Sequence, residues 1–189
     1  RDSSTSRGLG DVYKRQDFDY AENLAFSPDV IEQAKAALCN GATIVTDTNM
    51  ALSGISKPSL TKLGAKALCL MADPDIAREA KERGVTRAVV SMEHAARLDG
   101  PLIFAVGNAP TALIRLHELI GKDEVKPALV IGVPVGFVNV VEAKELFIGG
   151  KTPYIIARGR KGGSNVAAAI VNALLYQPVS YTHLRAHET

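Results

Sequence analysis

The stretch LIFAVGNAPTALIRLHELIG, residues 102–121, contains one complete unit of the fold. Its first five residues are all apolar, which is typical of a strand that is covered on both faces of a sheet. Further on, Leu113, Leu116 and Ile120 stand at positions i, i+3 and i+7, joined by Leu119, and this spacing gives a helix with one apolar face. A strand followed directly by an amphipathic helix predicts an α/β fold with parallel strands.

The same alternation of apolar runs and helical patterns continues along the chain from Ser27 onward. It predicts parallel strands that are joined by crossover helices. Five strands are expected, at residues 42–46, 66–71, 102–106, 128–133 and 154–157. We therefore expect one α/β domain with a mainly parallel five-stranded sheet.

Two helices begin at the same kind of signal. Residues 27–29 and 73–75 are Ser-Pro-Asp and Asp-Pro-Asp, which offer a capping oxygen, a proline at the first helical position and an acid in the first turn. Gly84 is a natural end for the second of these helices. Residues 86–98 are ambiguous at Ala88-Val89-Val90, and we interpret them as mainly helical.

Composition excludes several classes of protein. With 5% aromatic residues and no tryptophan, the chain lacks the stacking side chains of many nucleic-acid-binding proteins, and we expect no nucleic-acid partner. No apolar run reaches the roughly 20 residues that span a bilayer, and no signal peptide is evident, so we expect no membrane partner and a cytoplasmic location. Cys39 and Cys69 are isolated and are expected as buried thiols, not zinc ligands. His94 and His117 are expected on helix surfaces.

Both ends of the chain depart from the α/β pattern. Residues 1–16 and 178–189 have no sustained period of 2 or 3.6, and we expect both to be foreign-looking tails around a domain at 17–177. The histidines of the second tail are not candidates for catalysis. The net charge of +2 lies entirely within residues 1–16. Any attraction of the domain for anions must therefore come from particular loops.

Candidate chemistry lies in the loops that follow the strands, because an open parallel sheet binds ligands outside the carboxyl ends of its strands. The stretch RGRKGGSN, residues 158–165, places Arg158, Arg160 and Lys161 beside two glycines. Such a loop before a helix favours phosphate or carboxylate. A tight turn with solvated charges is an equally good interpretation, and the pattern is neither a P-loop nor a GxGxxG motif.

Two further loops each allow two interpretations, one as a ligand-binding loop and one as a purely structural loop. Asn108 is placed either to cap the following helix or to contact a ligand, with Thr111 in the first turn. The stretch GVPVGFV, residues 132–138, suits a stiff apolar shelf against a flat ring, or a loop packed on the neighbouring helix. Asp47 and Asp73 follow two strands, but Asp73 is better explained as a helix cap, and we expect no metal site.

Five stretches in this order are similar to one known family: DFDYAENLAFSPDV, TIVTDTNMALSGI, GNAPTALIRL, GVPVGFVNVVEAKE and RGRKGGSNVAAAIVNALLY. Together they resemble the precorrin-8X methylmutase family of corrin biosynthesis over residues 17–177. The details DTNMALSGI and GRKGGSNVAAAIVNALLY are more similar to the cobalt-precorrin-8 branch, the oxygen-independent route.

The resemblance implies a flavodoxin-like three-layer α/β/α fold and a homodimer with its active site near the subunit interface. The implied reaction, an isomerisation, moves a methyl group from C11 to C12 of the corrin macrocycle and gives hydrogenobyrinate or, with cobalt, cobyrinate. It implies no cofactor, and any cobalt belongs to the substrate.

The implied substrate is a large flat tetrapyrrole fringed with carboxylates, so it needs apolar shelves for its face and N–H groups or cations for its rim. We expect GVPVGFV and NMALSG to supply shelf and wall, and RGRKGGS and the helix start at GNAPT to hold carboxylates. The expected substrate-binding residues are Asp47, Thr48, Met50, Ser53, Gly54, Asn108, Thr111, Pro134, Gly136, Phe137, Arg160, Lys161, Gly162, Gly163 and Ser164.

The family's proton donor is a histidine four residues before the aspartate that matches Asp17. Tyr13 stands at that position here, and an unperturbed tyrosine pKa near 10 makes it a poor donor at neutral pH. We therefore expect a methylmutase whose acid is missing and whose turnover is low. Two alternatives stay open: a non-catalytic tetrapyrrole-binding protein, and a nucleotide- or sugar-phosphate-binding α/β enzyme that uses RGRKGGS on phosphate.

Overall fold

Six strands form one sheet in the order β1-β6-β5-β4-β2-β3. All neighbouring pairs are parallel except β1 and β6, which run antiparallel. The computed structural model describes residues 23–177. The strands are β1 (Leu24–Phe26), β2 (Thr43–Thr46), β3 (Lys66–Cys69), β4 (Leu102–Val106), β5 (Leu129–Gly132) and β6 (Tyr154–Ala157).

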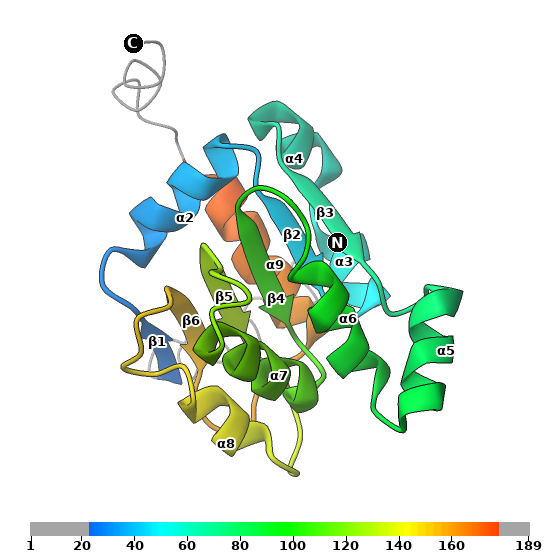
Figure 1. Cartoon of the computed structure of the whole chain (residues 1–189). Coiled ribbons are helices and arrows are strands. Elements are labelled where there is room, and N and C mark those ends of the chain that lie inside the picture. The colour runs from blue at the N-terminus through cyan, green and yellow to red at the C-terminus, as the bar shows by residue number, and fades with distance from the viewer. Residues whose placement is uncertain (1–22, 178–189) are drawn as a thin grey trace, which may run out of the picture.

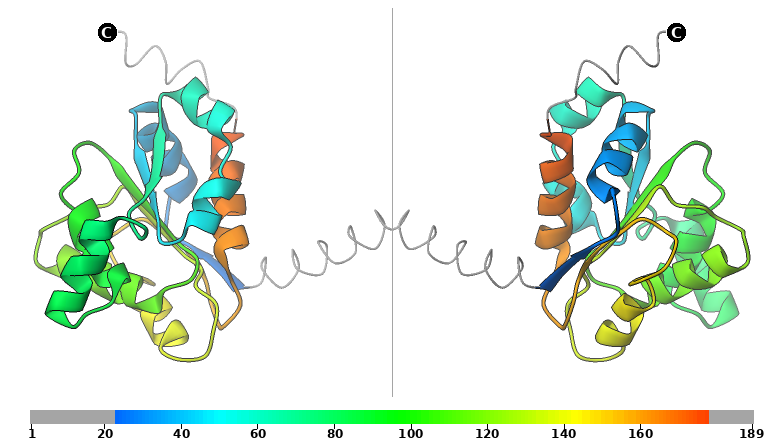
Figure 2. Two further views of the ribbon diagram at one scale, coloured as in Figure 1. Left: turned by 90° about the vertical axis from the view of Figure 1, so that its right-hand side faces the viewer. Right: turned by 90° about the vertical axis from the view of Figure 1, so that its left-hand side faces the viewer.

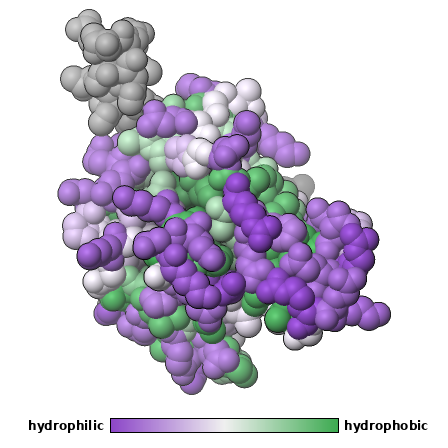
Figure 3. Space-filling view, in the orientation of Figure 1, coloured by the Kyte–Doolittle hydropathy of each residue, from purple (hydrophilic) through white to green (hydrophobic). Residues whose placement is uncertain are grey.

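Helices cover both faces of the sheet and make three layers (Figures 1 and 2). One apolar core joins the sheet to α2 (Val30–Cys39), α3 (Asn49–Gly54), α4 (Lys57–Leu63) and α9 (Ser164–Leu175). The core on the other face joins it to α6 (Arg87–Ala95), α7 (Pro110–Gly121) and α8 (Val140–Glu145). The remaining helix, α5 (Pro74–Arg83), packs on α6, and its outer surface is hydrophilic (Figure 3).

The predicted parallel strands are confirmed, with ends that differ from the expected ones by at most two residues. The sixth strand, β1, was not predicted. It is three residues long, pairs Leu24 with Ala157 at the antiparallel edge, and has one exposed and two half-buried residues. So short a strand at an edge shows neither a continuous apolar run nor an alternation over several residues.

The expected helix start at Asp73 is confirmed, whereas the one at Ser27 is wrong. Asp73 Oδ1 accepts a hydrogen bond from Asp75 N at 2.9 Å, and Gly84 ends α5 in the left-handed conformation. In contrast, α2 begins only at Val30, after Asp29. The Ser27 hydroxyl does not cap the helix, because it instead accepts a hydrogen bond from Tyr154 N of β6 at 2.8 Å.

The other expectations about single residues are met in most cases. Residues 87–95 are helical, as interpreted. His94 is half-buried beside Glu79, and His117 is exposed with its ring edge-on to a phenylalanine. Cys39 and Cys69 are free thiols, but they are only half-buried, and neither belongs to an apolar core cluster.

Several expectations concern parts of the chain that the structure does not describe. The two tails, 1–16 and 178–189, and Tyr13 lie outside the described residues. Within residues 23–177, no helix combines the length and the apolar content needed to cross a membrane. In the same range, no three His, Cys, Asp or Glu side chains gather into a group that could hold a metal ion.

Candidate active site

The four loops singled out in the sequence meet at the carboxyl ends of β2, β4, β5 and β6, which are neighbours in the sheet. The hydroxyls of Thr48 and Ser164 are 2.7 Å apart and share a hydrogen bond that joins the loop after β2 to the start of α9. Gly136 N donates to Arg160 O at 3.2 Å, which joins the loops after β5 and β6. Segments more than 100 residues apart are thus hydrogen-bonded to each other at one end of the sheet.

Asp47 holds the loop after β4. Its side chain is buried, and its two carboxylate oxygens accept the backbone N–H groups of Gly107, Asn108 and Ala109 at 2.7–2.8 Å. Burial raises the pKa of Asp47, while these three donors act in the opposite direction by favouring the charged form. The carboxylate at the end of β2 therefore fixes the loop that leads into α7.

This arrangement changes the expected roles of two residues. The N-cap of α7 is Ala109, and no side chain within its own segment caps it, so the expectation that Asn108 caps this helix is wrong. The expectation that the helix start at GNAPT holds a substrate carboxylate stays a prediction, but the N–H groups of residues 107–109 are not available for it, because Asp47 accepts a hydrogen bond from each. A contact of the exposed Asn108 side chain with substrate stays a prediction.

Two glycines let the loops approach backbone to backbone. A Cβ on Gly107 would lie 2.7 Å from the Cα of Ser164, and a Cβ on Gly162 would lie 1.9 Å from the carbonyl oxygen of Val133. Both distances are too short for any side chain. Gly163 N also donates to Val133 O at 2.8 Å, so the loop after β6 is fixed against the end of β5.

The side chain of Lys144 holds the loop after β6 by hydrogen bonds to its backbone. It lies in α8, is fully buried, and donates from Nζ to Gly159 O at 2.7 Å and to Lys161 O at 2.9 Å. Burial lowers its pKa to about 8. The sequence analysis missed this residue, although Val140, Ala143 and Phe147 form an i, i+3, i+7 stripe in which Lys144 occupies the i+4 position.

Four exposed apolar side chains in or beside the loops after β2 and β5 make up the predicted shelf. Phe137 and Val138 are 81% and 78% exposed, and Val135 and Met50 are also exposed. The guanidinium carbon of Arg160 lies 5.6 Å from the centroid of the Phe137 ring. An exposed aromatic ring with a cation against it suits a flat ligand that carries acidic groups at its rim.

Other predicted site residues lie apart from this shelf or have partners in the protein. Gly54 packs on α9, where its carbonyl accepts from Asn172 Nδ2 at 2.8 Å, while Ser53 is exposed on α3. Arg158 forms an ion pair with Glu145 at 3.7 Å. Thr111 faces away from the shelf and bonds the hydroxyl of Thr86 at 3.4 Å.

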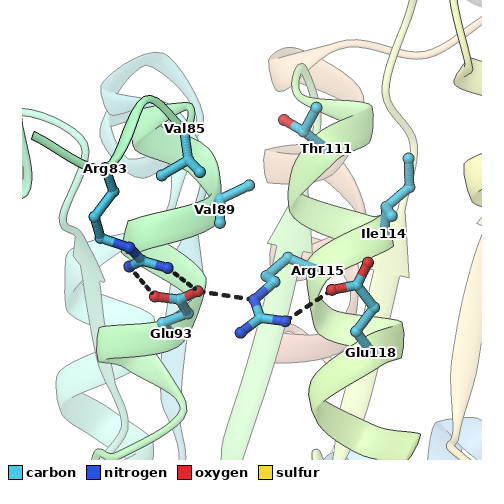
Figure 4. Close-up of a pocket in the computed structure, with 8 residues that line it drawn as sticks. All are labelled: Arg83, Val85, Val89, Glu93, Thr111, Ile114, Arg115 and Glu118. Carbon is cyan, nitrogen blue, oxygen red and sulfur yellow. Dashed lines mark hydrogen bonds and ion pairs between the residues drawn. The ribbon is translucent and has the colours of Figure 1, made fainter. Parts of the chain in front are cut away.

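Thr111 lines a separate groove between α6 and α7, with a cavity of about 350 Å³ (Figure 4). Glu93 lies between Arg83 and Arg115 there and bonds both, and these hydrogen bonds, above all that from Arg83, lower its pKa. Arg115 also bonds Glu118 at 2.7 Å. Because the arginines are paired with carboxylates, the groove offers an anion little unpaired charge.

Comparisons with known proteins agree on one family. A family model described as precorrin-8X methylmutase matches residues 12–177. The cobalt-precorrin-8 methylmutase of Salmonella typhimurium is 46% identical over 166 residues, which cover 87% of this chain and 77% of that protein. The precorrin-8X methylmutase of Pseudomonas aeruginosa is 41% identical over 159 residues, with 82% and 76% covered.

A solved structure of the precorrin-8X methylmutase of Thermus thermophilus superposes with a TM-score of 0.76 at 37% identity, covering 85% of this chain and 78% of that one. A second structure, of a precorrin-8X methylmutase related protein, has a TM-score of 0.75 at 30% identity. It covers 84% of this chain and 83% of its own.

Proposed function

Because the chain belongs to the precorrin-8X methylmutase family, we propose that the crevice above β2, β4, β5 and β6 binds a corrinoid tetrapyrrole and serves the family's methyl shift. This reaction is an isomerisation of cobalamin biosynthesis that moves a methyl group from C11 to C12 of the macrocycle. The substrate is precorrin-8 or its cobalt-containing form.

The observation that carries this proposal is the pairing of Phe137 with Arg160. A corrinoid is flat and apolar on its faces and anionic at its rim. A ring with 81% of its surface exposed and a guanidinium 5.6 Å from its centroid offers one partner for each part. Met50 and Val135 are also exposed, and both follow the carboxyl end of a strand, β2 and β5 respectively.

The chain's own residues bind and orient the ring, while the migrating methyl group stays within the substrate. No redox cofactor is needed for such an isomerisation, and cobalt, where present, is part of the substrate. A proton donor near the ring would ease the shift by withdrawing electron density from the conjugated system. Tyr13, which lies in the range matched by the family model, occupies the donor's place in the sequence.

The experiment that tests this proposal compares the chain with its Tyr13→His variant. Each is incubated with cobalt-precorrin-8, and conversion to cobyrinate is followed by absorption spectroscopy. We expect slow turnover by the chain and an increase of about 100-fold or more in kcat for the variant, the usual contribution of a general acid.

Equal and rapid turnover by both proteins would contradict the role of position 13. Cobyrinate binding without turnover by either protein would favour the alternative, a non-catalytic tetrapyrrole-binding protein. Protection of the chain against thermal unfolding by a nucleotide, and not by cobyrinate, would favour a phosphate-binding enzyme instead.

We also propose that the chain acts as a cytoplasmic homodimer whose site lies near the subunit interface. Val138 supports the dimer, since it is a large apolar side chain that is 78% exposed next to the proposed site, and such side chains commonly mark a contact surface. Sedimentation velocity at micromolar concentration tests it, and a monomer at every concentration would contradict the dimer.

A further inference from the structure

The two acceptors of Lys144 lie on either side of Arg160. Its Nζ donates to the carbonyl oxygens of Gly159 and Lys161, which belong to the peptide groups 159–160 and 161–162. The described residues contain no cis peptide bond, and in a trans peptide the N–H and C=O groups point in opposite directions. The N–H groups of Arg160 and Gly162 therefore point away from the buried amine.

Neither of these two N–H groups has a hydrogen-bond acceptor in the part of the chain that the structure describes. Among residues 23–177, no backbone carbonyl accepts a hydrogen bond from either of them. They lie next to the exposed Arg160 side chain, whose guanidinium rests against the Phe137 ring. Two adjacent backbone donors beside a guanidinium form the kind of concavity that binds an oxyanion.

We propose that Lys144 is a positioning residue: by turning the carbonyl groups of Gly159 and Lys161 inward, it presents the N–H groups of Arg160 and Gly162 to one rim carboxylate of the corrinoid. This inference rests on the proposed function. Lys144 itself touches no substrate, because it is fully buried beneath the loop. Its effect passes through the orientation of two peptide groups.

Other hydrogen bonds hold the loop after β6 near these donors. Gly136 N donates to Arg160 O, which lies between the two peptides, and Gly163 N donates to Val133 O directly after them. Gly162 has no space for a Cβ against Val133 O. These bonds leave the carbonyls of Gly159 and Lys161 without a partner of their own, and Lys144 supplies the donor for both.

The first test uses two ligands that differ only at the rim. Dissociation constants are measured for cobyrinic acid and for its heptamethyl ester with the unaltered chain, with Lys144→Met and with Lys151→Met. Lys151 is exposed in the turn before β6 and is the matched control for the same chemical change.

We expect Lys144→Met to weaken binding of the acid by about tenfold or more, since hydrogen bonds to a charged group contribute about 1.5–3 kcal/mol. Binding of the ester should change by less than about twofold, and Lys151→Met should bind both ligands as the unaltered chain does. Equal weakening of acid and ester, or no weakening of either, would overturn the proposal.

A second measurement needs no variant and stands if Lys144→Met fails to fold. The backbone amide signals of the ¹⁵N-labelled chain are followed during titration with acid and with ester. We expect the Arg160 and Gly162 signals to shift downfield with the acid and not with the ester, as for N–H groups that gain a charged acceptor.

The outcomes separate this inference from the proposed function. Binding of the acid without a response at these two amides would overturn the positioning role and leave the proposed function standing. Binding of neither ligand would contradict both.

Discussion

The loops after β4 and β6 are held by buried side chains of opposite charge. Asp47 takes up three N–H groups of residues 107–109, and Lys144 takes up two carbonyl oxygens on either side of Arg160. The first loop therefore has its donors occupied, while the second turns its donors outward. A single buried charge beside a loop thus decides which of its backbone groups remain for a ligand, and in our proposal the loop after β6 is the one that receives a carboxylate.

The largest effect is expected from removing the buried acid beneath the loop after β4. Asp47→Ala leaves three N–H groups without acceptors, and each buried unpaired donor costs about 1–3 kcal/mol. We expect the free energy of unfolding in urea to fall by at least about 3 kcal/mol. Asp73→Ala is the control, because this exposed cap accepts one N–H group and should cost only about 1 kcal/mol. Equal losses for the two variants would refute the special role of Asp47.

A smaller effect is expected from disturbing the loop after β6 while keeping Lys144. In Gly162→Ala the new Cβ would lie 1.9 Å from Val133 O, so the loop must move away from β5. Cobyrinate affinity, measured by calorimetry, should fall by about tenfold or more, because the Arg160 and Gly162 donors lose their positions. Gly121→Ala, which meets nothing within 4 Å at the end of α7, should bind as the unaltered chain does. Unchanged affinity in Gly162→Ala would show that the loop position is not needed.

The smallest effect is expected in the pH dependence of stability that the buried Lys144 produces. Burial lowers the pKa of Lys144 to about 8 from its ordinary value of 10.5. Between these values the unfolded chain keeps a proton that the folded chain has released, so this residue raises the free energy of unfolding as pH increases, by at most about 1.4 kcal/mol per pH unit. The neutral amine still has two N–H donors for the two carbonyls, so the loop stays held.

Urea unfolding from pH 7.5 to 9.5 measures this effect. The free energy of the unaltered chain should rise relative to that of Lys144→Met across this range. Parallel pH profiles for the two proteins would mean that the amine is not desolvated in the folded state.

These two residues also mark where prediction from the sequence ended. The strands at 102–106 and 154–157 were predictable because continuous apolar runs follow from burial on both faces, a property of each segment alone. The hydrogen bonds of Asp47 to the loop before α7 depend on β2 lying beside β4, 60 residues away in the chain, and no local pattern contains that neighbour. The sequence does show a lysine on an apolar stripe at position 144. It does not show the acceptors of this lysine, which lie in another loop.

In the predicted site, too, features of a single loop could be predicted, whereas those that depend on a distant segment could not. The exposed Phe137 and the cation of Arg160 were expected from the composition of their loops, and their contact follows from the neighbouring positions of β5 and β6. The helix start at GNAPT was assigned to a substrate carboxylate because a helix start usually has free donors. The three N–H groups just before α7 are already taken, since Asp47, which lies in a different segment, accepts a hydrogen bond from each of them.

The most direct test is a crystal structure of the chain with cobyrinate bound. We predict that one face of the macrocycle lies against Phe137 and that a rim carboxylate lies within hydrogen-bonding distance of the Arg160 and Gly162 amides. A carboxylate bound at residues 107–109, or a macrocycle in the groove between α6 and α7, would contradict this assignment.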